Sequence, residues 1–372
     1  MAAPRTSQPY VNAPMSLMLD VVRTLAALMV VAGHGVFFTI YRGPWPFSGA
    51  FQHAAVVIFF VLSGLVIASS VFERETTPSD YIIARLTRIL PVSLPAIFLG
   101  IGAYAIVVTW AWYVVPLPNG YVSLTRLALI LPLMFMSESP LGEGPAFNLP
   151  YWSLCYEVWY YILFAVAVYM RGTRRALWLA IGLVLAGPRV LFLMPAWLIG
   201  VAMARWRPGA SLSRPLTGVI WIVAGIAALT LAATYSDVVT AAVYAHTFLR
   251  WSMLHFSQHF LTDWIGAAAV AAIFIGLRPV ALHYARLLER AEGPIRSLAG
   301  SSFTLYLLHW PIMCVMRGFG VATTSFPVYM LILAAFQGLA LVLAHYSEAK
   351  RYILRDALRR ASDARRQPPL GA

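Results

Sequence analysis

The sequence predicts an all-α protein, a polytopic transmembrane helix bundle of about ten spans with both termini in the cytoplasm. Hydrophobic residues make up 60% of the 372 residues and charged residues only 11%, whereas soluble domains carry about 25% charged residues. Apolar stretches of about 20 residues, the length that crosses a bilayer, recur along nearly the whole chain. Basic residues gather in alternate loops, which is the pattern that orients a membrane protein.

The apolar stretches set the positions of the spans. The first run is too long for a cleaved signal peptide and lacks a small-residue cleavage site. A further apolar segment lies at 121–137. If it crossed the membrane, the basic cluster from Arg171 to Arg175 would lie on the outer side. We therefore expect an interfacial or re-entrant helix there, under an outer loop at 116–149, and a second outer loop at 236–259. The ten predicted spans are 17–40, 51–71, 89–115, 150–170, 175–188, 190–206, 216–235, 260–278, 299–317 and 327–347.

The basic residues orient these spans. Of the 27 Lys and Arg residues, 21 fall on one side and four on the other; Arg23 lies within a span, and Arg189 lies at the junction of the spans 175–188 and 190–206. The positive-inside rule places the richer side, with both termini, in the cytoplasm. The net charge of +13 therefore reflects topology, and we expect no nucleic-acid partner. We predict one transmembrane domain at 1–350 and a short basic cytoplasmic tail at 351–372, whose end, "RRASDARRQPPLGA", is predicted to be disordered near anionic lipid.

The two cysteines, Cys155 and Cys314, both lie in apolar runs. A disulfide framework or a zinc site would need clustered ligands. We expect both cysteines to be small packing residues, and we expect no metal.

Three ionisable residues form a stripe on the first span. At about 100° per residue, His34 returns to within roughly 20° of Arg23, about 16 Å further along the helix, and Asp20 lies on nearly the same line. Such groups usually face a bundle interior or a wet cavity. A structural ion pair explains Asp20 and Arg23 equally well. His34 lies deeper in the predicted span and is a candidate general base for a hydroxyl nucleophile.

Two further motifs have simple structural explanations. Ser63 and Gly64 in "IFFVLSGLVIASS" favour close helix packing, because no nucleophile elbow surrounds the serine. Arg85 and Arg88 in "RLTRILP" are typical topology determinants, although arginines at this position also suit the phosphates of a nucleotide-containing ligand.

Two further ionisable residues in the predicted spans, Glu157 and His309, are less easily explained. The segment "NLPYWSLCYEVWYYILF" holds Glu157 among aromatic residues that are typical of a membrane interface, and these aromatics do not account for the carboxylate. In "SSFTLYLLHWPI", His309 precedes Trp310 and Pro311, and a structural histidine that donates to a carbonyl freed by the proline is an open alternative to a functional one. The aromatic residues are Trp152, Tyr156, Trp159, Tyr160 and Tyr161.

Taken in order, these segments resemble the acyltransferase 3 family of bacterial membrane acyltransferases, which includes O-antigen acetylases and exopolysaccharide or nodulation-factor acyltransferases. The resemblance covers roughly residues 17–350. Val21-Val22 replaces a frequent Gly-Leu, and Tyr156 precedes Glu157 where an acidic residue is often found. The matching segments are "LDVVRTLAALMVVAGH", "FFVLSGLVI", "RLTR" with "ILP", "YWSLCYEVWYY" and "TLYLLHWPI".

The resemblance implies an enzyme of the bacterial inner membrane. It would transfer an acyl group, most simply acetyl, from cytoplasmic acyl-CoA (acetyl-CoA in that case) to a hydroxyl of a cell-surface or periplasmic glycan, free or lipid-linked. His34 would be the catalytic base, and a direct transfer and an acyl-enzyme route both stay open. The other implied catalytic residues are Arg23, Asp20 and Glu157; the donor phosphates would bind Arg85 and Arg88; and the implied substrate-binding residues are Trp152, Tyr156, His309, Trp310 and Ser63.

A transporter or flippase for a lipid-linked glycan or small solute is the alternative that composition leaves open. Ten spans and a polar stripe suit it equally well. Against it, the two halves of the sequence show no inverted repeat of interrupted helices.

Overall fold

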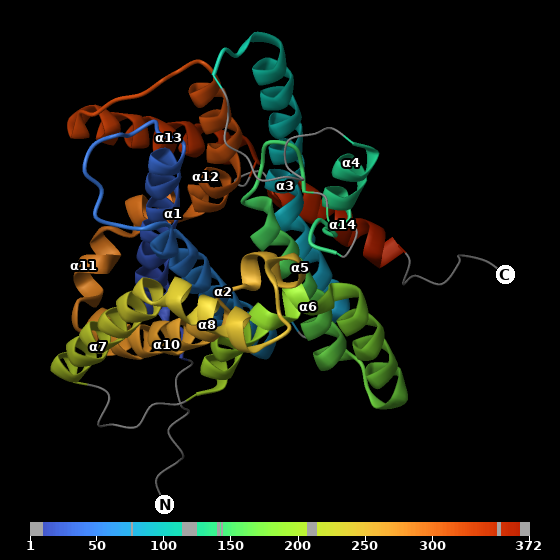
Figure 1. Cartoon of the computed structure of the whole chain (residues 1–372). Helices are drawn as coiled ribbons and strands as arrows, with labels where there is room; N and C mark the ends of the chain where they lie inside the picture. Colours follow the sequence, from blue (N-terminus) through green and yellow to red (C-terminus); the bar gives the residue numbers. More distant parts are fainter. Residues whose placement is uncertain are drawn as a thin grey trace, which may run out of the picture. The chain divides into compact units, whose positions relative to one another are not determined.

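The computed structural model describes residues 10–75, 77–113, 125–139, 142, 144–206, 214–347 and 351–364. In this part of the chain the structure is helical, and its only strand-like feature is a single bridge between Tyr41 and Thr323 (Figure 1). The helices are α1 Ala13–Phe37, α2 Gly49–Glu73, α3 Pro78–Trp110, α4 Arg126–Leu133, α5 Tyr151–Tyr169, α6 Gly172–Arg205, α7 Pro215–Thr234, α8 Ser236–His246, α9 Trp251–Leu254, the 3₁₀ turn η2 His255–Ser257, α10 Phe260–His283, α11 Ala285–Arg290, α12 Glu292–Gly318, α13 Phe326–Ser347 and α14 Arg351–Ala364.

Nine of the helices in the described ranges are long and apolar enough to cross a membrane. The chain is therefore a multi-pass membrane protein, as predicted. The difference between nine and ten lies in α6, which contains Gly187 at φ 73° and ψ 173°. A left-handed glycine followed by Pro188 ends one helix and starts the next. The predicted spans 175–188 and 190–206 correspond to these two segments of α6.

Two spans, α3 and α12, start much earlier than the apolar pattern indicated. The sequence predicted the third span from residue 89, but α3 begins at Pro78, because Thr77 caps it by accepting a hydrogen bond from the backbone N–H of Asp80 at 3.2 Å. A capping threonine, a proline in the first turn and an early aspartate all stabilise a helix start. α12 likewise begins at Glu292 rather than at 299.

The two predicted outer loops contain short helices. In the described part of 121–137, α4 has only eight residues, which is too short to cross a bilayer. In the loop at 236–259, α8, α9 and η2 occupy most of the chain. The predicted disorder of the C-terminal end is wrong for Arg359–Ala364, which continue α14; residues 365–372 lie outside the described part.

The chain forms two compact units, so the predicted domain at 1–350 has internal structure. The first contains the described residues of Met1–Gly33, Trp45–Glu73 and Pro188–Ala299. The second contains those of His34–Pro44, Arg74–Gly187 and Gly300–Ala372. Each unit combines segments that are far apart in the sequence.

Small residues bring helices together in the first unit. A Cβ at Gly64 of α2 would collide with the carbonyl oxygen of Trp197 in α6, and a Cβ at Gly200 would collide with that of Val61. α7 packs along α10 in the same way at Gly218 and Gly276 (Figure 1). Close approach through small residues is how membrane helices associate. The predicted packing role of the Ser63–Gly64 pair is confirmed.

The second unit is built mainly from α3, α5, α12, α13 and α14. Asn148, just before α5, is buried and connects two of these helices, because its side-chain amide donates to the carbonyl oxygens of Ala96 in α3 at 3.4 Å and Leu307 in α12 at 3.0 Å. Cys155 and Cys314 are both buried, which agrees with their predicted role as packing residues.

Candidate active site

The candidate active site lies in the second unit, where the two predicted membrane histidines meet. His34 of α1 and His309 of α12 are 275 residues apart in the sequence, yet His34 Nδ1 lies 2.8 Å from His309 Nε2. The two rings are nearly parallel, with centroids 5.1 Å apart. His34 belongs to the last turn of α1, at the opposite end of the helix from Asp20 and Arg23. His309 is fully buried and His34 half-buried.

The hydrogen bonds assign the tautomers of this pair when both rings are neutral. His309 Nδ1 lies 3.1 Å from the carbonyl oxygen of Leu305, which can only accept, so this nitrogen carries the proton. In a neutral imidazole the other nitrogen is then an acceptor. His309 Nε2 therefore accepts from His34 Nδ1–H. The remaining nitrogen of His34, Nε2, is left with a lone pair that can take up a proton.

Pro311 frees a backbone carbonyl near His309, and Asn148 rather than His309 bonds it. A proline removes the hydrogen bond to the carbonyl four residues earlier, which here is Leu307. That carbonyl accepts from Asn148 instead. The alternative that His309 braces the carbonyl freed by the proline is therefore wrong, because Asn148 takes that role and His309 turns its Nε2 to His34.

Trp310 closes one side of the histidine pair. Its ring meets His34 edge-on at 4.8 Å and Phe38 at 4.7 Å between centroids. Trp310 is 1% exposed, and its indole N–H has no hydrogen-bond partner among the described residues. A buried donor without a partner costs free energy and needs an explanation. Because this indole N–H lies next to the candidate base, a substrate atom is a natural acceptor for its hydrogen bond.

A line of polar groups continues from His309 along α5. The Tyr306 ring lies 6.1 Å from that of His309, and its hydroxyl forms a 2.8 Å hydrogen bond with Ser153. Glu157 lies one turn further along α5, accepts a hydrogen bond from the hydroxyl of Tyr161 and interacts electrostatically with Tyr306. Glu157 thus belongs to the polar interior of this unit, and Tyr306 and Ser153 are members that sequence reasoning missed.

The predicted donor-binding arginines lie near the other end of this line. Arg85 pairs with Glu75 at 2.6 Å, and its guanidinium lies 5.2 Å from the ring centre of Tyr81 and 5.8 Å from that of Tyr161. Both Arg85 and Arg88 lie close enough to interact electrostatically with the Tyr161 hydroxyl. Burial raises the pKa of the Glu75 carboxyl, and the Arg85 charge opposes that rise. Arg85, Arg88 and Glu157 thus all lie near Tyr161.

The aromatic residues around Glu157 are not an interfacial belt. Trp152 and Tyr156 are 5% and 0% exposed and pack edge-to-face on each other at 5.0 Å. Trp159, Tyr160 and Tyr161 are buried as well. A belt would face lipid headgroups. The belt interpretation is therefore wrong, because these rings fill the interior of the second unit.

Asp20 and Arg23 lie in the first unit, where they form a charged network. Asp20 accepts from Arg23 at 3.2 Å, as predicted, and also from Arg296 at 3.2 Å, while Arg296 bonds Glu292 at 2.7 Å. Ser63 is in the same unit and accepts a hydrogen bond from the indole N–H of Trp197 at 3.3 Å.

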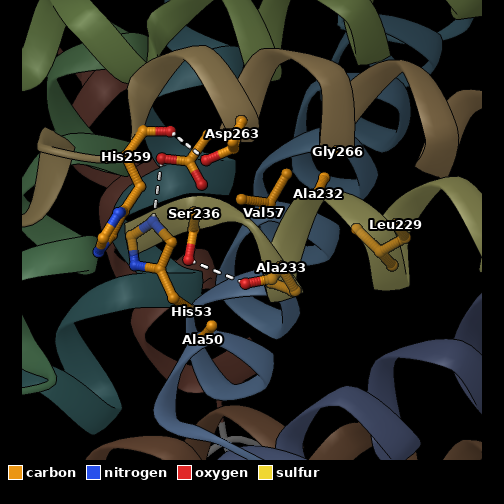
Figure 2. Close-up of a pocket in the computed structure, with 12 residues that line it drawn as sticks. Ala50, His53, Val57, Leu229, Ala232, Ala233, Ser236, His259, Asp263 and Gly266 are labelled. Atoms are coloured by element: carbon orange, nitrogen blue, oxygen red, sulfur yellow. Dashed lines mark hydrogen bonds and ion pairs between the residues drawn. The ribbon is translucent and has the colours of Figure 1, made fainter. Parts of the chain in front are cut away.

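The first unit holds a second polar cluster that the sequence did not indicate. His53 of α2 donates its Nε2–H to the carboxylate of Asp263 in α10 at 3.0 Å, and the ring of His259 lies 5.5 Å from that of His53. Figure 2 shows both histidines beside the Asp263 carboxylate, with Ser236 next to them. These residues border a cavity of about 20 Å³, which has room for about one water molecule. We interpret the cluster as a structural hydration site.

We expect His53→Leu to lower the stability of the protein. Asp263 is 5% exposed, and removing the partner of a buried carboxylate costs about 3 kcal/mol. The thermal unfolding temperature of the purified protein should fall, and it should recover in the double variant His53→Leu, Asp263→Leu, which removes both polar groups. An unchanged unfolding temperature in the single variant would show that the pair contributes no stability.

Within the described ranges, no three His, Cys, Asp or Glu side chains gather closely enough to hold a metal ion. No curated protein and no solved structure matches the chain. A family model described as an acyltransferase domain, Acyl_transf_3, matches residues 17–345. This match covers nearly the whole chain, including both histidines, and it favours an acyltransferase over a transporter. The chain belongs to the acyltransferase 3 family.

Proposed function

We propose that this membrane acyltransferase moves an acyl group, most simply acetyl, from cytoplasmic acyl-CoA to a hydroxyl of a cell-surface or periplasmic glycan at the bacterial inner membrane. The observation that carries the proposal is the His34–His309 pair. Its hydrogen bonds leave His34 Nε2 as an acceptor, which is what a hydroxyl nucleophile requires of a general base.

The chemistry proceeds at His34 Nε2. This nitrogen takes the proton of the acceptor hydroxyl while the hydroxyl oxygen attacks the thioester carbonyl carbon. The C–S bond then breaks, and the CoA thiolate takes the proton back from His34. His309 accepts from His34 Nδ1–H throughout, so it holds the ring and its tautomer and stabilises the transient imidazolium. The products are an O-acyl glycan and free CoA, and His34 is regenerated.

Trp310 supplies the complementary electrophilic group. Its buried indole N–H has no partner among the described residues, and it lies beside the ring of His34. We assign this N–H to the carbonyl oxygen of the thioester, which becomes negatively charged when the hydroxyl adds. A donor that is already in position at that oxygen stabilises the transition state more than the ground state.

Arg85 and Arg88 would bind the donor phosphates. Arginine forms charge-assisted, bidentate hydrogen bonds with phosphate. The Arg85 guanidinium lies over the ring of Tyr81 and near that of Tyr161, and it pairs with Glu75, a partner that a phosphate would displace. Glu157 bonds Tyr161, which the two arginines also approach, and it interacts with Tyr306 beside His309. We propose that it keeps the region between the arginines and the histidine pair polar. The Asp20–Arg23–Arg296 network ties α1 to α12, the two helices that carry the catalytic histidines.

The direct test is transfer of radiolabel from acetyl-CoA. Membranes that contain the protein should label a glycan fraction, and membranes that contain the same amount of His34→Ala should not. Label that appears on protein but never on glycan would contradict the proposed acceptor. Equal glycan labelling with and without the protein would contradict the proposed activity.

We expect the double variant Arg85→Ala, Arg88→Ala to raise the apparent KM for acyl-CoA. Hydrogen bonds to charged groups contribute about 1.5–3 kcal/mol each, so an increase of at least tenfold is expected at unchanged protein level. Glu75→Gln is the matched control and should change KM in the opposite direction. It removes the carboxylate that competes with the donor phosphate for Arg85, so KM should fall. A double variant that fails to accumulate in the membrane would instead identify the arginines as topology determinants.

The proposed orientation predicts the result of reporter fusions. A periplasmic reporter joined after Tyr41 should be active, and one joined after Arg366 should be inactive, because the basic residues favour a cytoplasmic position for both termini. The reverse pattern would overturn the orientation, and with it the side from which the donor enters.

A further inference from the structure

A cavity of about 730 Å³ lies in the second unit, between α14 and the helices α3, α12 and α13. α14 packs against α3, which it crosses in Figure 1. Cavities of about 300–1,000 Å³ are typical of sites for organic ligands. Its walls are mainly apolar, and the lining residues are Pro91, Val92, Pro95, Leu99, Thr304, Leu308, Leu343, Tyr346, Arg351, Ile353, Leu354 and Ala357.

The walls of this cavity require an apolar occupant. Ile353 and Tyr346, which line it, are 56% and 65% exposed. Water makes few hydrogen bonds to such walls, whereas hydrocarbon restores the contacts of a packed interior. α3, α12 and α13 are membrane spans by length and composition, so the acyl chains of the bilayer are adjacent to the cavity.

α14 adds a charge at the edge of this apolar site. Ile353, Leu354 and Ala357 form one side of the helix, and Arg351 is the charged residue among those that line the cavity. At about 100° per residue, Arg351 lies about 60° from Leu354, at the edge of this side of the helix. Arg355 and Arg359 continue away from the cavity, so that the three arginines share an arc of roughly 80°. An amphipathic helix with a basic face lies along the surface of an anionic membrane.

We propose that the cavity binds one acyl chain of an anionic phospholipid, whose headgroup phosphate pairs with Arg351. The acyl chain of the lipid fills the space between α14 and the three spans. The headgroup phosphate forms an ion pair with the guanidinium of Arg351 where α14 meets the membrane surface. The site thereby fastens α14 to the bundle. The inference depends on the membrane location of the chain and not on the proposed acyl transfer.

The donor acyl-CoA is the competing occupant, and the positions of the arginines disfavour it. Arg85 is engaged with Glu75 and with two tyrosine rings, and neither Arg85 nor Arg88 is among the residues that line the cavity. Arg351, which does line it, follows α13 and belongs to the interfacial helix. A membrane phospholipid matches this combination of one phosphate-binding charge and an apolar cavity.

Native mass spectrometry of the full-length protein in detergent tests the proposal. The protein is exchanged into equal amounts of phosphatidylglycerol and phosphatidylcholine with matched acyl chains. We expect one tightly retained lipid per chain, with phosphatidylglycerol preferred roughly fivefold, the preference that one basic residue gives at an anionic surface. A parallel sample with added palmitoyl-CoA reports whether the donor takes the site instead.

Three variants separate the two parts of the site. Ala357→Trp should abolish retention because the indole occupies the cavity. Arg351→Gln should keep retention but reduce the headgroup preference to near one. Arg355→Gln, on the same helix but outside the cavity lining, should behave like the unaltered protein. Equal retention in the protein and in Ala357→Trp, or displacement of the phospholipid by palmitoyl-CoA, would overturn the proposal.

Discussion

His34→Gln should lower the rate of acyl transfer by a factor of about 10² to 10⁴, the usual contribution of a general base, while the protein inserts and accumulates normally. Glutamine preserves the hydrogen bond, because its side-chain N–H₂ can donate to His309 Nε2 as His34 Nδ1 does at 2.8 Å. Glutamine cannot take up a proton at neutral pH. The variant therefore separates proton transfer from packing and hydrogen bonding.

A pair of variants at His309 provides the control. His309→Gln keeps an oxygen that can accept from His34 Nδ1–H, so the tautomer of His34 is preserved and most activity should remain. His309→Leu removes the acceptor, so His34 can carry its proton on either nitrogen, and we expect a further loss of about 10-fold to 100-fold, as for other groups that orient a functional histidine. The pH dependence of the rate should change only in His309→Leu.

The measurement is transfer of radiolabelled acetyl to glycan in membranes that contain matched amounts of each variant. Near-normal transfer by His34→Gln would show that a hydrogen bond is sufficient at this position, and the general-base role would have to be abandoned. Equal losses in His309→Gln and His309→Leu would show that the second histidine does more than accept a hydrogen bond.

The two histidines illustrate what the sequence could and could not predict about the site. Each was identified as a candidate because an ionisable group in an apolar stretch needs a polar environment. Their pairing could not be predicted, since 275 residues separate them and only the packing of α1 against α12 brings them together. For the same reason the sequence could not predict that Asn148 takes the carbonyl that Pro311 frees.

The start of the third span and the aromatic residues near Glu157 were mispredicted for local reasons. The apolar window excluded Arg85 and Arg88 and so started the third span after them, whereas the Thr77 cap starts the helix at Pro78. Both arginines are therefore helical residues of α3, and both lie near Tyr161 of α5. The aromatic residues near Glu157 were misinterpreted because composition does not distinguish a lipid-facing ring from a buried one.

Trp310→Phe should lower kcat by about 10² to 10³, the usual effect of removing one hydrogen-bond donor from an oxyanion site, with little change in the KM for acyl-CoA. Phenylalanine keeps an aromatic ring against His34 and Phe38, which Trp310 contacts at 4.8 Å and 4.7 Å. It removes only the buried N–H and part of the ring. An interaction that is made chiefly in the transition state affects kcat and leaves ground-state binding unchanged.

Trp197→Phe is the matched control for this prediction. Trp197 is also fully buried, but its N–H donates to Ser63 at 3.3 Å in the first unit. Its replacement should lower the thermal unfolding temperature by the modest amount that one lost hydrogen bond produces and leave kcat unchanged. If Trp310→Phe behaves in the same way, with lower stability and normal kcat, then its indole N–H has only a structural role and the carbonyl oxygen of the thioester must be stabilised by another group.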